Sequence, residues 1–190
     1  DKVLAIVREL SCNAYDAHVA AGTLNTPFEV HLPNNFEPWF SIRDNGIGLS
    51  SEDIMTIYTT YFESTKTESN DMVGCLGLGS KTPFAYTDNF SVTSYHGGYK
   101  RVYKAYIGNG GVPAISMLTE EPSSEPNGLC VSMSVKREDF FKFIDCAKKV
   151  YPHFKLQPKI SGAACKIEVP KKILEGTNWY RAQNSYNWSS

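Results

Sequence analysis

The sequence of 190 residues has no long hydrophobic run, and no stretch approaches the roughly 18 consecutive apolar residues that a membrane-spanning helix needs. The first residues also lack the apolar core of a signal peptide. The chain also has no large excess of positive or negative charge. Its 19 Lys and Arg residues nearly balance its 20 Asp and Glu residues, for a net charge of -1. This balance gives the chain as a whole no attraction to nucleic acid. We therefore expect a soluble, cytoplasmic protein with no transmembrane segment and no direct nucleic-acid signal.

Cysteines are few, and their spacing does not match a disulfide framework or a zinc-finger site. The five residues form no Cys-x-x-Cys pair and have no histidine at zinc-finger spacing: Cys12, Cys75, Cys130, Cys146 and Cys165. An odd and dispersed set is typical of reduced cytosolic thiols. The sequence therefore predicts neither disulfides nor a cysteine metal centre.

Apolar material, by contrast, is sufficient for a folded core, since 42% of the residues are hydrophobic and 13% are aromatic. This composition excludes a disordered chain, and the length suits one domain or one domain with an appendage. The charges are unevenly placed: residues 1–70 hold ten acidic and four basic residues, whereas residues 71–190 hold ten acidic and fifteen basic ones. Because the chain starts with Asp1 and not with Met, we expect a segment of a longer protein.

The hydrophobic pattern predicts helices interspersed with strands. Apolar residues recur at intervals of three and four over Lys2–Ala21, and helical patterns return at 50–62, 80–86 and 137–151. Runs rich in β-branched and aromatic residues predict strands at 28–32, 39–43, 90–95, 99–107, 114–118, 129–135 and 164–169. Turns divide the four strands between 90 and 135, which predicts an antiparallel meander. The sequence therefore indicates an α+β two-layer sandwich.

Three clusters of polar or glycine residues are candidates for a site, and the first lies on the N-terminal helix. Glu9, Asn13 and Asp16 project within a sector of roughly 60° on one helix face. A carboxylate beside an amide suits a hard cation such as Mg²⁺, which prefers oxygen ligands. The alternative is an ordinary solvated helix face.

The second cluster is Asp44-Asn-Gly-Ile-Gly48, where a predicted strand ends. Asp44 offers a hydrogen-bond acceptor, and Gly46 and Gly48 allow the backbone to approach a planar ligand closely. The alternative is a tight turn, for which Asp-Asn-Gly is ordinary chemistry.

The third cluster is glycine-rich and precedes a predicted helix. Gly74, Gly77 and Gly79 allow backbone N–H groups to converge on an anion, with Ser80 at the helix start. It is not a Walker P-loop, because Ser80 stands where that motif requires Lys, and Lys81 comes one place late. The alternative is a flexible loop.

The order of these clusters resembles the ATP-binding domain of the GHKL superfamily, which includes gyrase, the ninety-kilodalton heat-shock chaperone, histidine kinases and MutL. Ser64-Thr65-Lys66 is further similar to the lid of MutL-type domains. The resemblance implies a Bergerat fold, with helices on one face of a mostly antiparallel mixed sheet. It implies an ATP-binding domain over 1–136, followed by a helix, strand and tail over 137–190 that pack on it or lead into a second domain.

Within the superfamily, 58–66 and 76–86 are similar to phage rIIA-like proteins, which act in lysis inhibition and host exclusion. This similarity covers 7–107. It implies a location in the host cytoplasm, with peripheral membrane association as an option, and phage or host proteins as partners.

The resemblance also implies a role for each site residue. Glu9 would be the catalytic base that deprotonates the attacking water, and Asn13 would bind Mg²⁺. Asp44 would accept the adenine amino hydrogen. Gly46 and Gly48 would make room for the base, and Asp16 would position the helix or a water. The phosphates would be bound by Gly74, Gly77, Gly79 and Ser80, with Lys81 or Lys66 as charge partner.

Two departures from the family pattern leave two functions open. Leu129 occupies the position where the family usually has Thr, and the following domain from which many relatives take a lysine is not found in this sequence. The leading hypothesis is a slow, Mg²⁺-dependent ATPase in which closure of a lid at 63–79 drives a conformational or dimerisation switch. The alternative is a nucleotide-binding interaction module without significant hydrolysis.

Overall fold

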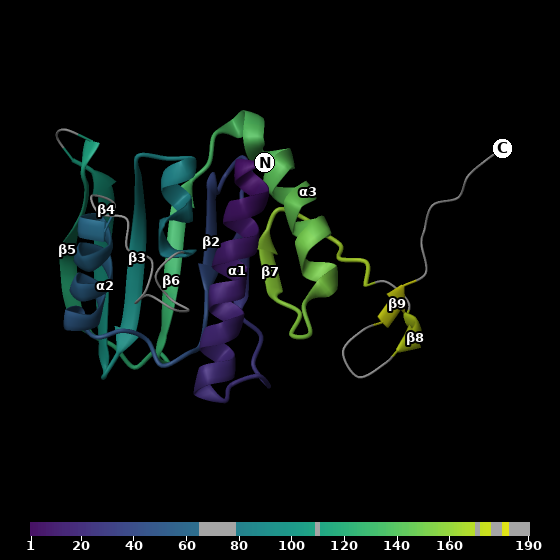
Figure 1. Ribbon diagram of the computed structural model, residues 1–190, viewed down its shortest axis with the longest axis horizontal. Helices are drawn as coiled ribbons and strands as arrows, with labels where there is room; N and C mark the ends of the chain where they lie inside the picture. Colours follow the sequence, from purple (N-terminus) through teal and green to yellow (C-terminus); the bar gives the residue numbers. More distant parts are fainter. Residues whose placement is uncertain (65–78, 109–110, 170–171, 176–179, 183–190) are drawn as a thin grey trace.

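The computed structural model describes residues 1–64, 79–108, 111–169, 172–175 and 180–182, with side chains for 1–57, 82–108 and 111–169. Within these ranges, helices cover one face of a seven-stranded sheet (Figure 1). The helices are α1 (Lys2–Ala21), α2 (Ser51–Ser64) and α3 (Phe140–Val150), with three 3-10 segments, η1 (Gly79–Ala85), η3 (Arg137–Asp139) and η4 (Tyr151–His153). The predicted α+β two-layer sandwich is confirmed.

The strands of the large sheet follow the order β5-β4-β3-β6-β2-β1-β7. Their bounds are β1 (Glu29–Leu32), β2 (Trp39–Arg43), β3 (Asn89–His96), β4 (Tyr99–Ile107), β5 (Pro113–Pro122), β6 (Gly128–Ser134) and β7 (Lys159–Gly162). Neighbouring strands are antiparallel except β1 and β7, which are parallel. A separate hairpin joins β8 (Lys172–Glu175) and β9 (Tyr180–Ala182). The sheet is therefore mixed but mostly antiparallel.

Two sequence predictions about these elements were wrong, and a third, the helix at 80–86, is confirmed only in part. The expected four-strand meander stops after β5, because β6 lies between β3 and β2, where Val131 pairs with both Val92 and Ile42. The expected strand at 164–169 is absent from that described range, and the pairing segment is β7, which lies alongside β1. The segment at 80–86 is a 3-10 helix and not an α-helix, and it contains Pro83, which removes a backbone donor.

Helix α1 is fixed at both ends and packs along the sheet. The Asp1 carboxylate accepts the Val3 N–H at 3.0 Å, and Gly22 ends the helix in the left-handed conformation, with φ 68°. The buried positions form a stripe at helical spacing: Val3, Ile6, Val7, Leu10, Ser11, Ala14 and His18. The adjacent polar stripe, which begins with Glu9 and Asn13, is thereby directed away from the core.

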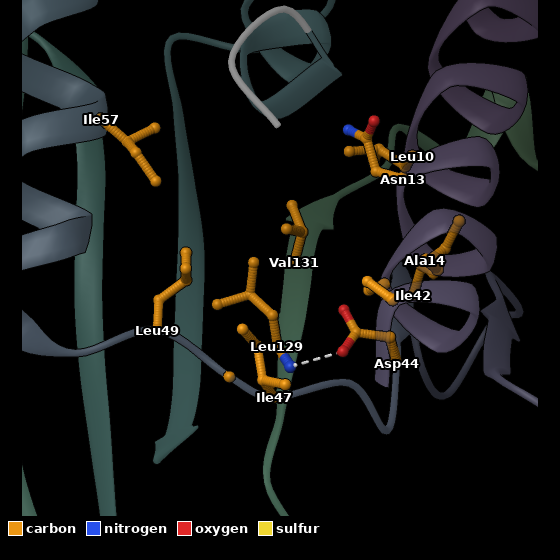
Figure 2. Close-up of a pocket in the computed structure, with 13 residues that line it drawn as sticks. Leu10, Asn13, Ala14, Ile42, Asp44, Ile47, Leu49, Ile57, Leu129 and Val131 are labelled. Carbon is orange, nitrogen blue, oxygen red and sulfur yellow. Dashed lines mark hydrogen bonds between the residues drawn. The ribbon is translucent and has the colours of Figure 1, made fainter. Parts of the chain in front are cut away.

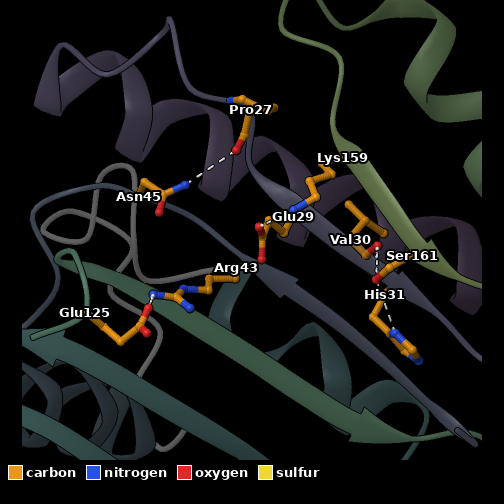
Figure 3. A network of polar contacts seen from close by, with 9 residues as sticks. All are labelled: Pro27, Glu29, Val30, His31, Arg43, Asn45, Glu125, Lys159 and Ser161. Carbon is orange, nitrogen blue, oxygen red and sulfur yellow. Dashed lines mark hydrogen bonds and ion pairs between the residues drawn. The ribbon is translucent and has the colours of Figure 1, made fainter. Parts of the chain in front are cut away.

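Because successive side chains of a strand point to opposite faces, one face of the sheet is apolar and the other is polar. Inward residues such as Phe40, Ile42 and Val92 are buried beneath the helices. The opposite face carries polar pairs, including Arg43 with Glu125 at 3.1 Å and Lys159 with Glu29 at 3.3 Å (Figure 3). No helix in the described part of the chain is long and apolar enough to cross a membrane.

Part of the segment after residue 136 packs on the preceding residues. Helix α3 contacts α1, and its Phe143 ring lies 5.0 Å from that of Phe40. Strand β7 forms one edge of the sheet. The division of the chain at residue 136 stays a prediction.

Candidate functional site

A pocket opens on the helix side of the sheet, between α1, the loop after β2, α2 and β6 (Figure 2). Its lining is largely apolar, with one amide and one carboxylate among the side chains: Leu10, Asn13, Ala14, Ala17, Ala20, Ile42, Asp44, Ile47, Gly48, Leu49, Ile57, Leu129 and Val131. Apolar walls with a few convergent polar groups are typical of small-molecule sites. Helix α1 contributes a wall because its small residues allow close approach to the sheet.

Asp44 lies at the end of β2 and is only 7% exposed. Its Oδ1 accepts two backbone N–H groups, from Gly46 at 2.9 Å and from Leu129 at 3.1 Å. The other oxygen points into the space between α1 and β6 (Figure 2). Burial raises the pKa of the Asp44 carboxyl, although the amides of Gly46 and Leu129 act in the opposite direction. The Asp44 carboxylate is therefore a hydrogen-bond acceptor that the backbone holds in place and that is largely shielded from solvent.

Leu129 supplies the backbone half of this arrangement. Its carbonyl accepts the Asp44 N–H at 2.9 Å, while its own N–H binds the carboxylate. Its side chain lines the pocket. At the position where the resemblance leads one to expect Thr, the chain therefore uses a main-chain donor to orient Asp44.

Gly46 and Gly48 in this loop pack so closely against neighbouring atoms that a side chain would clash. A Cβ at Gly46 would lie 2.9 Å from the Ala17 Cβ. Gly48 has φ +69°, and a Cβ there would lie 2.1 Å from the carbonyl oxygen of Tyr95. The loop therefore lies tightly against α1 on one side and β3 on the other.

The polar residues of α1 divide into two groups. Asn13 projects into the pocket from α1 (Figure 2). Glu9 is not among the lining residues; its side chain is 39% exposed, and its Oε1 accepts the Arg8 Nη2 donor at 2.8 Å. Asp16 is exposed. The structure thus brings Asn13 and Asp44 to one pocket, while Glu9 lies one helical turn before Asn13.

The predicted phosphate-binding residues lie between α2 and the first turns of η1 in the sequence. Lys66, Gly74 and Gly77 lie outside the described residues, as does most of the predicted lid. Gly79, Ser80 and Lys81 form the beginning of η1, for which the backbone alone is described. Helix η1, which begins at the C-terminal end of the third cluster, contacts α1, the helix that carries Asn13.

Asn13 is the predicted magnesium ligand among the described residues that line the pocket. The described residues include no group of three or more His, Cys, Asp or Glu side chains that could hold a metal ion. The Asn13 amide oxygen fits Mg²⁺ as a partial ligand, because Mg²⁺ commonly takes one or two protein oxygens together with water and substrate phosphates. The donor set therefore suits a metal that arrives with a phosphate ligand.

Sequence reasoning missed one buried polar group beside the pocket. His18, which belongs to none of the three predicted clusters, is fully buried at the last turn of α1. Its Nε2 accepts the Asn45 N–H at 2.9 Å. The helical spacing could have predicted this burial, because His18 continues the buried stripe of Val7, Ser11 and Ala14 at spacings of four, three and four.

A helix-backed mixed sheet whose pocket holds a strand-terminal aspartate and a helical asparagine defines a candidate nucleotide-binding sandwich. A family model described as "Histidine kinase-, DNA gyrase B-, and HSP90-like ATPase" matches residues 3–123, more than half of the chain. The chain belongs to this family, and the GHKL resemblance inferred from the motifs is confirmed.

Similar proteins include chaperones and part of a topoisomerase. The chain is 26% identical over 187 residues to the chaperone protein HtpG of Rickettsia canadensis, covering 86% of the chain and 28% of that protein. For HtpG of Rickettsia bellii, the identity is 27% over 196 residues, covering 90% and 30%. One of the subunits of type 2 DNA topoisomerase 6 from Pyrobaculum aerophilum is 31% identical over 86 residues, covering 44% and 16%. The chain thus spans less than a third of the length of these relatives.

Proposed function

We propose that this chain binds ATP together with Mg²⁺ in the pocket between α1 and β6. The observation that carries the proposal is Asp44: two backbone amides fix one oxygen at 2.9 and 3.1 Å, and the second oxygen faces an apolar pocket. The 6-amino group of adenine is a donor that would satisfy this oxygen. The apolar side chains of Ile47 and Leu129 would cover the faces of the base.

The same geometry provides selectivity among purines. Guanine presents a carbonyl oxygen where adenine presents its amino group, so Asp44 would face a second acceptor. A buried carboxylate that loses its donor is costly, because neither water nor the wrong base replaces the hydrogen bond. We therefore infer that the pocket prefers ATP to GTP.

Asn13 would hold the metal at the phosphate end. Bound Mg²⁺ would neutralise charge on the phosphates. Glu9 lies four residues before Asn13, about 6 Å along the helix axis, and would accept a proton from the attacking water. In the structure the Glu9 side chain pairs with Arg8 at 2.8 Å and is not among the residues that line the pocket. We infer that hydrolysis is slow, because Glu9 lies outside the lining of the pocket and has to reorient before it can act as a base.

The remaining parts of the function are proposals that follow from the motifs. Phosphate contacts are assigned to Gly74, Gly77, Gly79 and Ser80, with Lys66 or Lys81 as charge partner. Closure of the segment 63–79 over ATP would then act as a conformational or dimerisation switch. A role in lysis inhibition or host exclusion rests on the phage rIIA-like resemblance alone, which the relatives found do not support.

Calorimetric titration of the chain with MgATP tests the binding proposal, and MgGTP tests its selectivity. We expect saturable binding of MgATP and at least about tenfold weaker binding of MgGTP. Absence of MgATP binding would remove the proposed function.

A second measurement separates the ATPase from the interaction module. Phosphate release is followed for the native chain and for Glu9→Gln, with Glu52→Gln as a control at an exposed carboxylate on α2. A rate that falls only in Glu9→Gln supports hydrolysis. Equal background rates, together with intact MgATP binding, would favour the interaction module.

A further inference from the structure

The residue that follows Asp44 is held through both of its backbone polar groups. The Asn45 N–H donates to His18 Nε2 at 2.9 Å, and the Asn45 carbonyl accepts the Thr23 hydroxyl at 3.0 Å. The Asn45 side chain also donates to the Pro27 carbonyl at 3.4 Å (Figure 3). All of these partners belong to α1 or to the segment that directly follows it. The loop between Asp44 and Gly46 is thus attached to the C-terminal end of the helix that carries Asn13.

The hydrogen bonds also determine the state of His18. Because Nε2 accepts the Asn45 N–H, it carries no proton. The proton of the neutral ring is therefore on Nδ1, which lies 3.1 Å from the Thr23 carbonyl and donates to it. A buried ring with both nitrogens bonded has one orientation and one tautomer.

The end of α1 is built so that these two residues meet. Gly22 reverses the chain with φ 68°, and the Thr23 N–H returns to the His18 carbonyl at 3.0 Å. The Thr23 hydroxyl then lies 3.2 Å from His18 Nδ1 and points its own donor at Asn45. On its other side, the His18 ring packs edge-on against Phe28, with centroids 6.3 Å apart. Thr23 and His18 therefore form one rigid unit.

We propose that His18 and Thr23 are positioning residues that set adenine recognition by holding Asn45, and through it Asp44, in register with α1. This inference rests on the proposed ATP site. Asp44 is bonded to β6 through Leu129, and Asn45 is bonded to α1, so the acceptor for the base is fixed from both walls of the pocket. Because α1 also carries Asn13, one rigid helix sets the distance between the adenine acceptor and the metal ligand.

The test compares four variants at Thr23 and His18, and one control variant, in calorimetric titrations with MgATP and MgGTP. Thr23→Val removes the hydroxyl at nearly constant volume, and Thr23→Ser keeps it. His18→Leu removes the acceptor, and His18→Gln can present its amide oxygen to the Asn45 N–H. Val3→Ala, at the other end of the buried stripe of α1, controls for a general loss of stability.

We expect Thr23→Val and His18→Leu to bind MgATP roughly five- to tenfold more weakly, with MgGTP almost unchanged. Thr23→Ser, His18→Gln and Val3→Ala should stay within about twofold of the native chain for both nucleotides. A role limited to stability would lower both affinities together or neither. Nitrogen NMR of the native His18 ring should show the proton on Nδ1.

Each result decides the inference. Native binding of MgATP with unchanged affinity in Thr23→Val would overturn it and leave the proposed ATP site intact. Equal losses for both nucleotides, or a proton on Nε2 of His18, would also overturn it. If the native chain binds no MgATP, the proposed function itself fails, and the positioning role fails with it.

Discussion

Two buried aspartates, Asp44 and Asp139, are exposed by only 7% and 9%, yet their carboxyl pKa values shift in opposite directions. Asp139 binds Lys142 Nζ at 2.6 Å and accepts the Tyr86 hydroxyl at 2.8 Å, and these donors lower its pKa. The pKa of Asp44 is raised because burial outweighs two backbone amides, and no ion pair joins Asp44 to a described Lys or Arg. Asp139 is satisfied by the fold, whereas Asp44 retains an oxygen for a ligand.

The difference is the one expected between a structural carboxylate, Asp139, and the proposed ligand-binding carboxylate, Asp44. Asp139 joins the start of α3 to Tyr86, which directly follows η1, and the Tyr86 hydroxyl also accepts the Lys136 N–H at 3.0 Å. Every part of that arrangement has a partner within the chain. A desolvated carboxylate in a pocket with one oxygen unused is instead a common mark of a binding site. Four predictions test this distinction, beginning with the largest effect.

Gly48→Ala should disrupt the Asp44 end of the pocket as a whole. The new Cβ would lie 2.1 Å from the Tyr95 carbonyl oxygen, and φ is +69°, so the backbone has to move. We expect the free energy of unfolding to fall by about 3 kcal/mol or more, measured by urea denaturation.

Gly97→Ala is the matched control, because Gly97 has φ +62° but no heavy atom within 4 Å of the position that a Cβ would take. It should cost about 1 kcal/mol, for the conformation alone. Equal losses in the two variants would mean that the loop is not held against β3.

Asp44→Asn should separate binding from stability. The amide oxygen can still accept the Gly46 and Leu129 N–H groups, but its NH₂ group would face the amino group of adenine. We expect MgATP affinity to fall about 50-fold, roughly 2 to 3 kcal/mol, with no loss in the free energy of unfolding, because a desolvated charge is removed.

The paired variant Asp139→Asn should do the reverse. MgATP affinity, measured by calorimetry, should stay within about twofold of native, while the loss of the charged partner of Lys142 lowers the free energy of unfolding.

If the Asp44→Asn variant binds MgATP as tightly as the native chain does, Asp44 is not part of the binding site.

Tyr86→Phe tests the contact at the Asp139 end. The variant loses the donor to Asp139 and the acceptor for Lys136, so we expect the free energy of unfolding to fall by about 1 kcal/mol in urea titrations. Burial, with a smaller effect of Asp139, raises the pKa of Tyr86 to about 12, so the hydroxyl remains a donor at neutral pH.

Tyr99→Phe, at a tyrosine that is 43% exposed on β4, provides the control and should change little. A similar loss in both variants would show that the Tyr86 hydroxyl contributes nothing specific.

The sequence predicted the parts of the site that depend on local order, and less well those that depend on distant pairing. Helical spacing identified Asn13 and the end of a predicted strand identified Asp44, while the GHKL resemblance implied that both belong to one site, and both do line one pocket. The contribution of Leu129 depends on β6 lying beside β2, which turn signals cannot reveal because they report only local reversals. The role of His18 required knowledge of which N–H it faces, a tertiary contact across 27 residues.

The smallest predicted effect is the pH dependence of stability. For Asp44, the native carboxyl binds a proton more readily than the unfolded one, so the free energy of unfolding falls as pH rises from the ordinary value of 3.8 through the raised native value. For Asp139 the native pKa is lowered, so its contribution is complete above 3.8 and is lost as pH falls through the native value. Urea denaturation between pH 3 and 7 should test both expectations. As pH rises above about 4, the native chain should lose stability relative to Asp44→Asn. As pH falls below about 4, the native chain should lose its higher stability relative to Asp139→Asn. Parallel curves for native and Asp44→Asn would mean that the Asp44 carboxyl is not desolvated, and the contrast between the two aspartates would then disappear.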